Sequence, residues 1–103
     1  MRVTVSKHQP SMRNSVAEAM VEVRNAAGLH IRVAGMISKT AISFRSKISI
    51  ARGVETVNAR SIVELTALGA VHGTRLTLRA EGPDAEAAVK ALVELFERKF
   101  GED

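Results

Sequence analysis

His30 is the residue of this sequence best placed for nucleophilic chemistry. It lies between Gly28 and a segment whose apolar residues recur at helical spacing. The unpaired N–H groups and the positive dipole end at a helix start favour an anion and disfavour a protonated ring. A neutral imidazole is nucleophilic at physiological pH, so His30 is a candidate acceptor of a phosphoryl group.

Arg32, two residues further on, supports this interpretation. A phosphoryl group on His30 would bring nearly two negative charges, which helix N–H groups and the Arg32 guanidinium can hold by charge-assisted hydrogen bonds. The alternative, from position alone, is that His30 only caps the helix. The other two histidines, His8 and His72, lie in an N-terminal arm and in a loop, and we interpret them as solvated side chains.

The composition excludes several other kinds of chemistry. The chain has no cysteine, which rules out disulfides, Cys-based zinc sites, iron–sulfur clusters and thiol nucleophiles. It shows no metal-type cluster and no G-x-S-x-G or P-loop pattern, so we expect no metal and no cofactor. Its 103 residues allow one domain with a modest core. Without a membrane-length apolar run or a secretory signal, it is expected to be cytoplasmic and not inserted in a membrane.

The net charge of +4 is unevenly distributed along the chain. Residues 1–16 carry three bases and no acid and show no sustained periodicity, which indicates a flexible basic N-terminal extension. Residues 17–103 carry twelve bases against eleven acids and are nearly neutral. Their basic middle and acidic end suit docking on an acidic protein surface as well as they suit binding phosphate.

The elements that would position His30 follow from the spacing of apolar residues. Alternation predicts four strands, over residues 20–24, 46–50, 54–58 and 74–79. Helical spacing predicts three helices, over residues 31–44, 62–68 and 85–100. Ser61 and Glu64 form a capping-box pattern before the second helix, and Asp84 is a candidate cap of the third.

In chain order these elements are β-α-β-β-α-β-α. Each strand offers one apolar face, and amphipathic helices can cover it. Alternating strands are typical of an antiparallel sheet whose second face is in water. The sequence therefore predicts an α+β fold, an open-faced β-sandwich with a four-stranded antiparallel sheet covered on one face by three helices.

Three separate segments resemble one known family. The segment NAAGLHIR at residues 25–32 resembles the active-site segment of HPr, the histidine-containing phosphocarrier protein of the phosphoenolpyruvate-dependent sugar phosphotransferase system. The segment TVNARSIV at residues 56–63 resembles the second signature of that family, and LTLRAEG at residues 76–82 resembles its last strand and turn. The resemblance keeps the order and spacing of the family over residues 17–103.

The resemblance implies an HPr-like domain over residues 17–103 that is a phosphoryl carrier and not an enzyme. The matching histidine, His30, would accept phosphate from phosphorylated enzyme I and pass it to an enzyme IIA component. Arg32 matches the arginine that stabilises the phosphate, and Gly28 matches the glycine of the active-site turn. Val33 replaces the usual proline of the family, which predicts a slightly looser site. We expect a monomer.

Ser61 matches the serine that an ATP-dependent kinase modifies in many members of the family, so an HPr serine kinase/phosphorylase is a further candidate partner. Plain helix capping is an equally good interpretation, because Glu64 would repel a phosphoserine. Ile62 and Val63 are candidates for an apolar patch that docks partners, with core burial as the alternative for one of them.

Two other classes of function stay open. A regulatory HPr-like module would act through phosphorylation of Ser61 or through docking, without feeding sugar uptake; the intact pair of His30 and Arg32 argues against it. A small nucleic-acid binder is suggested by the basic extension. The chain has only three Phe and no Trp or Tyr for stacking bases, so we expect no nucleic-acid partner.

Overall fold

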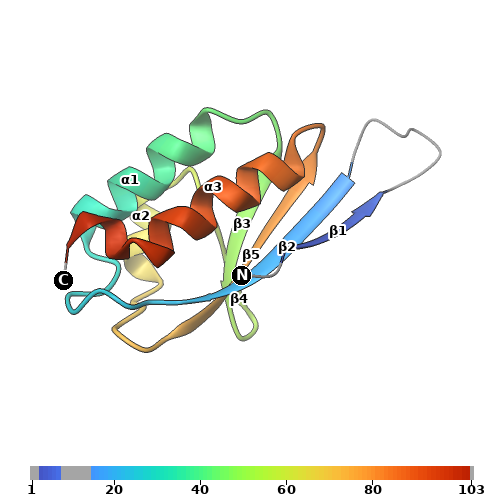
Figure 1. The fold of residues 1–103 in the computed structure, drawn as a ribbon. Coiled ribbons are helices and arrows are strands. Elements are labelled where there is room, and N and C mark those ends of the chain that lie inside the picture. Colours follow the sequence, from blue (N-terminus) through green and yellow to red (C-terminus); the bar gives the residue numbers. More distant parts are fainter. Residues whose placement is uncertain (1–2, 8–14, 103) are drawn as a thin grey trace.

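The computed structural model describes residues 3–7 and 15–102, which form two layers. One layer is an open sheet, and the other consists of helices packed on one of its faces (Figure 1). The strands are β1 Thr4–Lys7, β2 Ser15–Glu22, β3 Lys47–Arg52, β4 Glu55–Asn58 and β5 Arg75–Gly82. The helices are α1 Ile31–Ile42, α2 Ile62–Ala67 and α3 Ala85–Glu97, followed by the short 3-10 helix η1 Lys99–Gly101.

The sheet has the strand order β1-β2-β5-β3-β4, and every neighbouring pair is antiparallel. The central strand β5 shows why only one face is covered. Leu76, Leu78 and Ala80 are buried beneath the helices, whereas Arg79 and Glu81, which alternate with them, are exposed. This period of two places apolar side chains on one face of a pleated strand. The predicted α+β open-faced sandwich is confirmed.

Helix α3 covers the sheet over β2 and β5, while α1 contacts both α2 and α3. Its buried face includes Ala88, Leu92 and Phe96, which recur at helical spacing. Phe96 also meets Phe100 edge-on, with ring centroids 4.8 Å apart. No helix among the described residues is long and apolar enough to cross a membrane.

The sheet has five strands, so the prediction of four is wrong. The additional strand β1 lies within the predicted extension, where it pairs with β2 through Thr4 opposite Glu18 and Val5 opposite Ala17. The alternation in so short a strand is too brief to distinguish it from a loop, and its pairing partner is distant in sequence. Strand β2 also begins earlier than predicted, at Ser15. Residues 8–14 of the extension lie outside the described residues, and the division at residue 16 remains a prediction.

Two local predictions near α3 are also corrected. The helix ends at Glu97 and not at Phe100, because Lys99 and Phe100 adopt left-handed φ values of 53° and 54°. Asp84 occupies the N-cap position of α3 without donating a side-chain oxygen to the helix. Its carboxylate instead accepts hydrogen bonds from the backbone N–H groups of Arg45 and Ser46, both at 2.9 Å, and from Ser46 Oγ at 2.6 Å.

Candidate functional site

His30 is the N-cap residue of α1, as its place in the sequence indicated. Its backbone is extended, with φ −79° and ψ 177°, and its Nδ1 accepts a hydrogen bond from the backbone N–H of Arg32 at 3.3 Å. About a third of the side chain is exposed. The capping contact is therefore present, and a ring nitrogen lies directly at the start of the helix.

The turn before His30 is held by backbone contacts that require glycine. Gly28 has a left-handed φ of 75°, and a Cβ at this position would lie 2.7 Å from the carbonyl oxygen of Ala70. Leu29 is buried and donates its N–H to that same carbonyl at 3.0 Å. Asn25 is fully buried, and its Nδ2 donates to the Gly28 carbonyl at 2.8 Å. These contacts fix the point from which His30 projects.

Glu102 is a member of the site that the sequence did not indicate. Its carboxylate accepts hydrogen bonds from His30 Nε2 at 3.0 and 3.2 Å, from Asn25 Nδ2 at 2.9 Å and from Arg32 Nη2. Hydrogen bonds from Arg32, Asn25 and His30 lower the pKa of Glu102 from 4.5 to about 2. The only sequence signal was the acidic character of residues 80–103, which does not distinguish Glu102 from its neighbours.

The contacts of the His30 ring agree on one neutral tautomer. An ionised carboxylate can only accept, so Nε2 must donate its proton to Glu102. The backbone N–H of Arg32 can only donate, so Nδ1 must present its lone pair. The geometry therefore assigns the proton to Nε2 and the nucleophilic lone pair to Nδ1.

Arg32 is brought to the site, but its guanidinium is already partnered. Nη2 donates to Glu102 and also to the carbonyl of Phe100 at 3.4 Å, while Nη1 lies 3.6 Å from the sulfur of Met36. Half of the side chain is exposed, so the guanidinium can be reached by an incoming anion. Val33, where the family has proline, is fully buried in the core.

Ser61 caps α2, and this half of the predicted capping box is confirmed. Its Oγ accepts a hydrogen bond from the backbone N–H of Glu64 at 3.0 Å. The Glu64 side chain does not return to Ser61; its Oε1 accepts from the backbone N–H of Asn58 at 2.9 Å. The N–H of Ser61 donates instead to the Asn58 carbonyl.

Ile62 and Val63 are exposed at 39% and 76%, so core burial does not account for either of them. Two further exposed apolar residues lie close to the active-site turn. Ile31 directly follows His30 and is 71% exposed, and Val71 adjoins the backbone position that Gly28 approaches. Apolar side chains thus remain accessible on α2 and beside the turn, as a docking surface requires.

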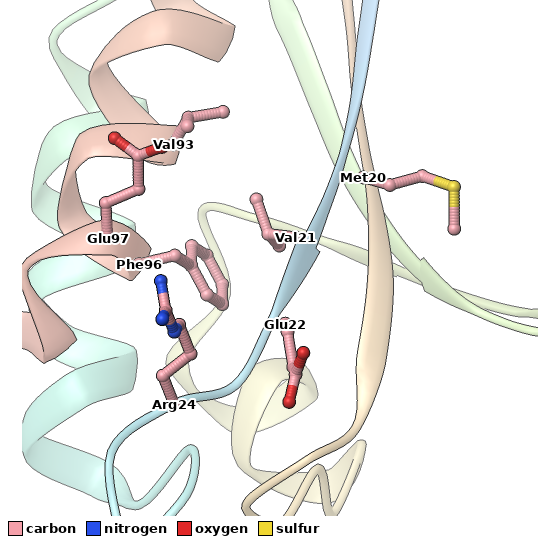
Figure 2. A pocket seen from close by; sticks show the side chains of 7 residues that line it. All are labelled: Met20, Val21, Glu22, Arg24, Val93, Phe96 and Glu97. Atoms are coloured by element: carbon pink, nitrogen blue, oxygen red, sulfur yellow. The ribbon is translucent and has the colours of Figure 1, made fainter. Parts of the chain in front are cut away.

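A separate pocket lies between β2 and α3, where Figure 2 shows Arg24 rising beside Phe96. Neither His30 nor Arg32 lines this pocket, so it is distinct from the site. Its lining residues are Met20, Val21, Glu22, Arg24, Val93, Phe96 and Glu97. Among the described residues, no group of three or more His, Cys, Asp or Glu side chains is arranged to hold a metal ion.

The chain is similar to known proteins over most of its length. The family model described as the PTS HPr component phosphorylation site matches residues 17–98. The phosphocarrier protein HPr of Treponema pallidum is 45% identical over 83 residues, which cover 81% of this chain and 94% of that protein. The crystal structure of an HPr from Thermoanaerobacter tengcongensis has a TM-score of 0.80 and 44% identity, covering 84% of this chain and 97% of that chain.

A longer relative also matches. The multiphosphoryl transfer protein of Vibrio cholerae is 38% identical over 87 residues, which cover 82% of this chain and 22% of that protein. The match to the family model includes the Gly28 turn, the His30 cap and the start of α2, and the solved structures share the sheet and its helical layer. The chain therefore belongs to the HPr family of phosphocarrier proteins of the phosphotransferase system.

Proposed function

We propose that His30 accepts a phosphoryl group on Nδ1 from phosphorylated enzyme I and passes it to an enzyme IIA component. The observation that carries this proposal is the Nδ1 lone pair at the start of α1, with Nε2 engaged by Glu102. The family membership and the similarity to a multiphosphoryl transfer protein support the partners. The protein would turn over as a phosphorylated carrier in the cytoplasm, as a monomer.

The transfer is balanced as a displacement at phosphorus. The Nδ1 lone pair forms a new N–P bond while the bond from phosphorus to the donor atom of enzyme I breaks, and its electron pair leaves with the donor. The proton on Nε2 stays, so the ring gains positive charge as the N–P bond forms. In the reverse direction the ring leaves phosphorus as a neutral imidazole, which is why a histidine carrier can donate as well as accept.

The start of α1 is suited to hold the bound group. The N–H of Arg32, which now donates to Nδ1, can donate to a phosphoryl oxygen instead. The first turn of α1 has no acidic residue to repel the added charge. The Arg32 guanidinium would be shared between Glu102 and the phosphoryl group, which supports moderate rather than tight binding.

The test is incubation with phosphoenolpyruvate and enzyme I, followed by intact-mass measurement. We expect one acid-labile phosphoryl adduct on the unsubstituted protein and on His72→Ala, a matched control in the exposed loop, and none on His30→Ala. Phosphohistidine is acid-labile and base-stable, whereas phosphoserine shows the opposite pattern. An adduct that persists in His30→Ala, or none on the unsubstituted protein with its cognate enzyme I, would refute the proposal.

The regulatory alternative through Ser61 has weaker support. Its Oγ already accepts from the N–H of Glu64, and a phosphate there would stand beside the Glu64 carboxylate. Incubation with ATP and an HPr serine kinase would separate the alternatives, since a base-labile adduct lost in Ser61→Ala would favour regulation. The exposed Ile62 and Val63 suit docking of a partner in either case.

A further inference from the structure

The last described residues form a hook, defined as Lys99–Glu102, that returns the chain to the start of α1. Lys99 and Phe100 are non-glycine residues with left-handed φ values of 53° and 54°. This conformation is unfavourable for L-residues and persists only where the surroundings hold it. Strain of this kind concentrates at functional sites, and it indicates that the hook is held in place by its contacts.

Two anchors hold the hook, one apolar and one polar. The Phe100 ring is 1% exposed and packs edge-on against Phe96 of α3. The Phe100 carbonyl accepts from Arg32 Nη2, so the same guanidinium contacts both the backbone and the carboxylate of the hook. Chain ends without such anchors are usually poorly ordered. Together these contacts place Glu102 against a ring that is 72 residues away in sequence.

The Glu102 carboxylate discriminates between the two neutral tautomers of His30. With the proton on Nε2, the ring donates to Glu102 and accepts from the N–H of Arg32. With the proton on Nδ1, a lone pair would face the carboxylate and a ring N–H would face the Arg32 N–H. Both existing hydrogen bonds would then be lost, and like groups would be opposed.

The same contact responds to the charge that the reaction creates. The ring becomes positive as its Nδ1 lone pair forms a bond to phosphorus, and Nε2 lies 3.0 Å from a Glu102 oxygen. A carboxylate at this distance stabilises the developing imidazolium. Arg32, paired with the same carboxylate, offsets its negative charge toward the phosphoryl group.

We propose that Glu102 is a positioning residue for His30. Its carboxylate keeps the proton on Nε2, leaves Nδ1 as the nucleophile and counters the positive charge that the ring gains during transfer. This inference rests on the proposed phosphoryl transfer at His30 and assigns the hook a part in it. A merely structural hook would hold the chain end without affecting the ring.

The first experiment reads the ring in the unphosphorylated protein, without any partner. NMR of the His30 Nε2–H proton is compared in the unsubstituted protein, Glu102→Gln, Glu102→Ala and the control Glu97→Gln, which removes an acid of α3 outside the site. We expect a protected proton in the unsubstituted protein and the control, and about tenfold faster exchange with water in Glu102→Ala. An Nε2–H proton that exchanges equally fast in all four proteins would overturn the contact.

The second experiment measures the initial rate of phosphorylation by phosphoenolpyruvate and enzyme I. We expect Glu102→Gln to slow the reaction about tenfold, as loss of a carboxylate that orients a histidine commonly does. Glu102→Asp, which keeps the charge, should recover part of the rate. Glu97→Gln should match the unsubstituted protein. Amide spectra establish that each variant keeps the fold, and Asp serves as the second variant if Gln does not.

The two proposals fail in different ways. If the unsubstituted protein forms no adduct, phosphoryl transfer at His30 is refuted, whereas the ring spectra still report on the Glu102 contact. If the adduct forms on His30 at an equal rate in the unsubstituted protein and Glu102→Gln, transfer stands and the positioning by Glu102 is refuted. Slower transfer in Glu102→Gln with recovery in Glu102→Asp supports both.

Discussion

At the scale of single residues, the site consists of donors and acceptors that are matched in number and direction. The Glu102 carboxylate accepts from His30, Arg32 and Asn25, and the helix start donates to the remaining ring nitrogen. Each contact restrains the ring in one plane and one tautomer. The chemistry available to His30 is therefore set by neighbours that come from both ends of the domain.

Gly28 allows a residue-scale prediction, because a side chain there would meet backbone and not a movable side chain. Gly28→Ala should destabilise the fold by about 2 kcal/mol or more, from the left-handed φ and the collision with the Ala70 carbonyl. Gly53→Ala is a matched control, since Gly53 has φ 61° with open space around it. Urea unfolding measures both, and equal losses would show that the collision contributes nothing.

At the scale of elements, Asp84 joins the loop before β3 to the turn before α3. Its carboxylate accepts three hydrogen bonds from Arg45 and Ser46, whose neighbour in space is Gly82. Burial raises the pKa of Asp84, but the hydrogen bonds from Arg45 and Ser46 outweigh it and lower the pKa below 3.8. The ionised form therefore stabilises the link between the two elements.

Asp84→Asn should lower the free energy of unfolding at pH 7 by about 1–2 kcal/mol, because it weakens hydrogen bonds to a charged acceptor. Since the pKa is lower in the folded state, this stabilisation is complete above pH 3.8 and is lost as the pH falls through the folded pKa. Urea unfolding at pH 7 and near pH 3 should show the difference from the unsubstituted protein shrinking in acid.

The control for this prediction is Glu86→Gln, which removes an exposed ion pair with Lys90. Such pairs contribute about 0.5 kcal/mol or less. A loss for Asp84→Asn no larger than that of Glu86→Gln at pH 7 would contradict a linking function for the Asp84 carboxylate.

At the scale of the whole molecule, β1 covers an edge of the sheet that would otherwise be open. It pairs with β2, and Val3 packs against the core. Figure 1 shows β1 far from the end of the chain that carries the hook. The family model begins at residue 17, so β1 is an addition to the matched region and lies away from the site.

Removing residues 1–12 should therefore leave a folded protein that still accepts a phosphoryl group at an unchanged rate. We expect a loss of about 1 kcal/mol in urea unfolding, from the missing pairing with β2. The exposed β2 edge should also promote association at high protein concentration, which analytical ultracentrifugation measures. A folded truncated protein that no longer accepts phosphate would show that this segment contributes to the site or to docking.

The sequence by itself determined the features that depend on spacing of a few residues. His30 at a helix start, the Gly28 turn, the Ser61 cap and the alternation of β5 are all local patterns, and all are present in the structure. Backbone sterics and hydrogen bonding within one turn produce them, so they can be recognised without knowing how the chain folds. The HPr family was identified from the same local segments.

Only the tertiary structure decided which distant residues meet. Glu102 reaches His30 from 72 residues away, Asp84 bonds a loop 38 residues before it, and β1 acquires its strand character by pairing with β2. None of these contacts has a sequence period, because each depends on how packed elements bring separate segments together. The capacity of His30 for chemistry was therefore legible in the sequence, whereas the carboxylate that orients its ring was supplied by the fold.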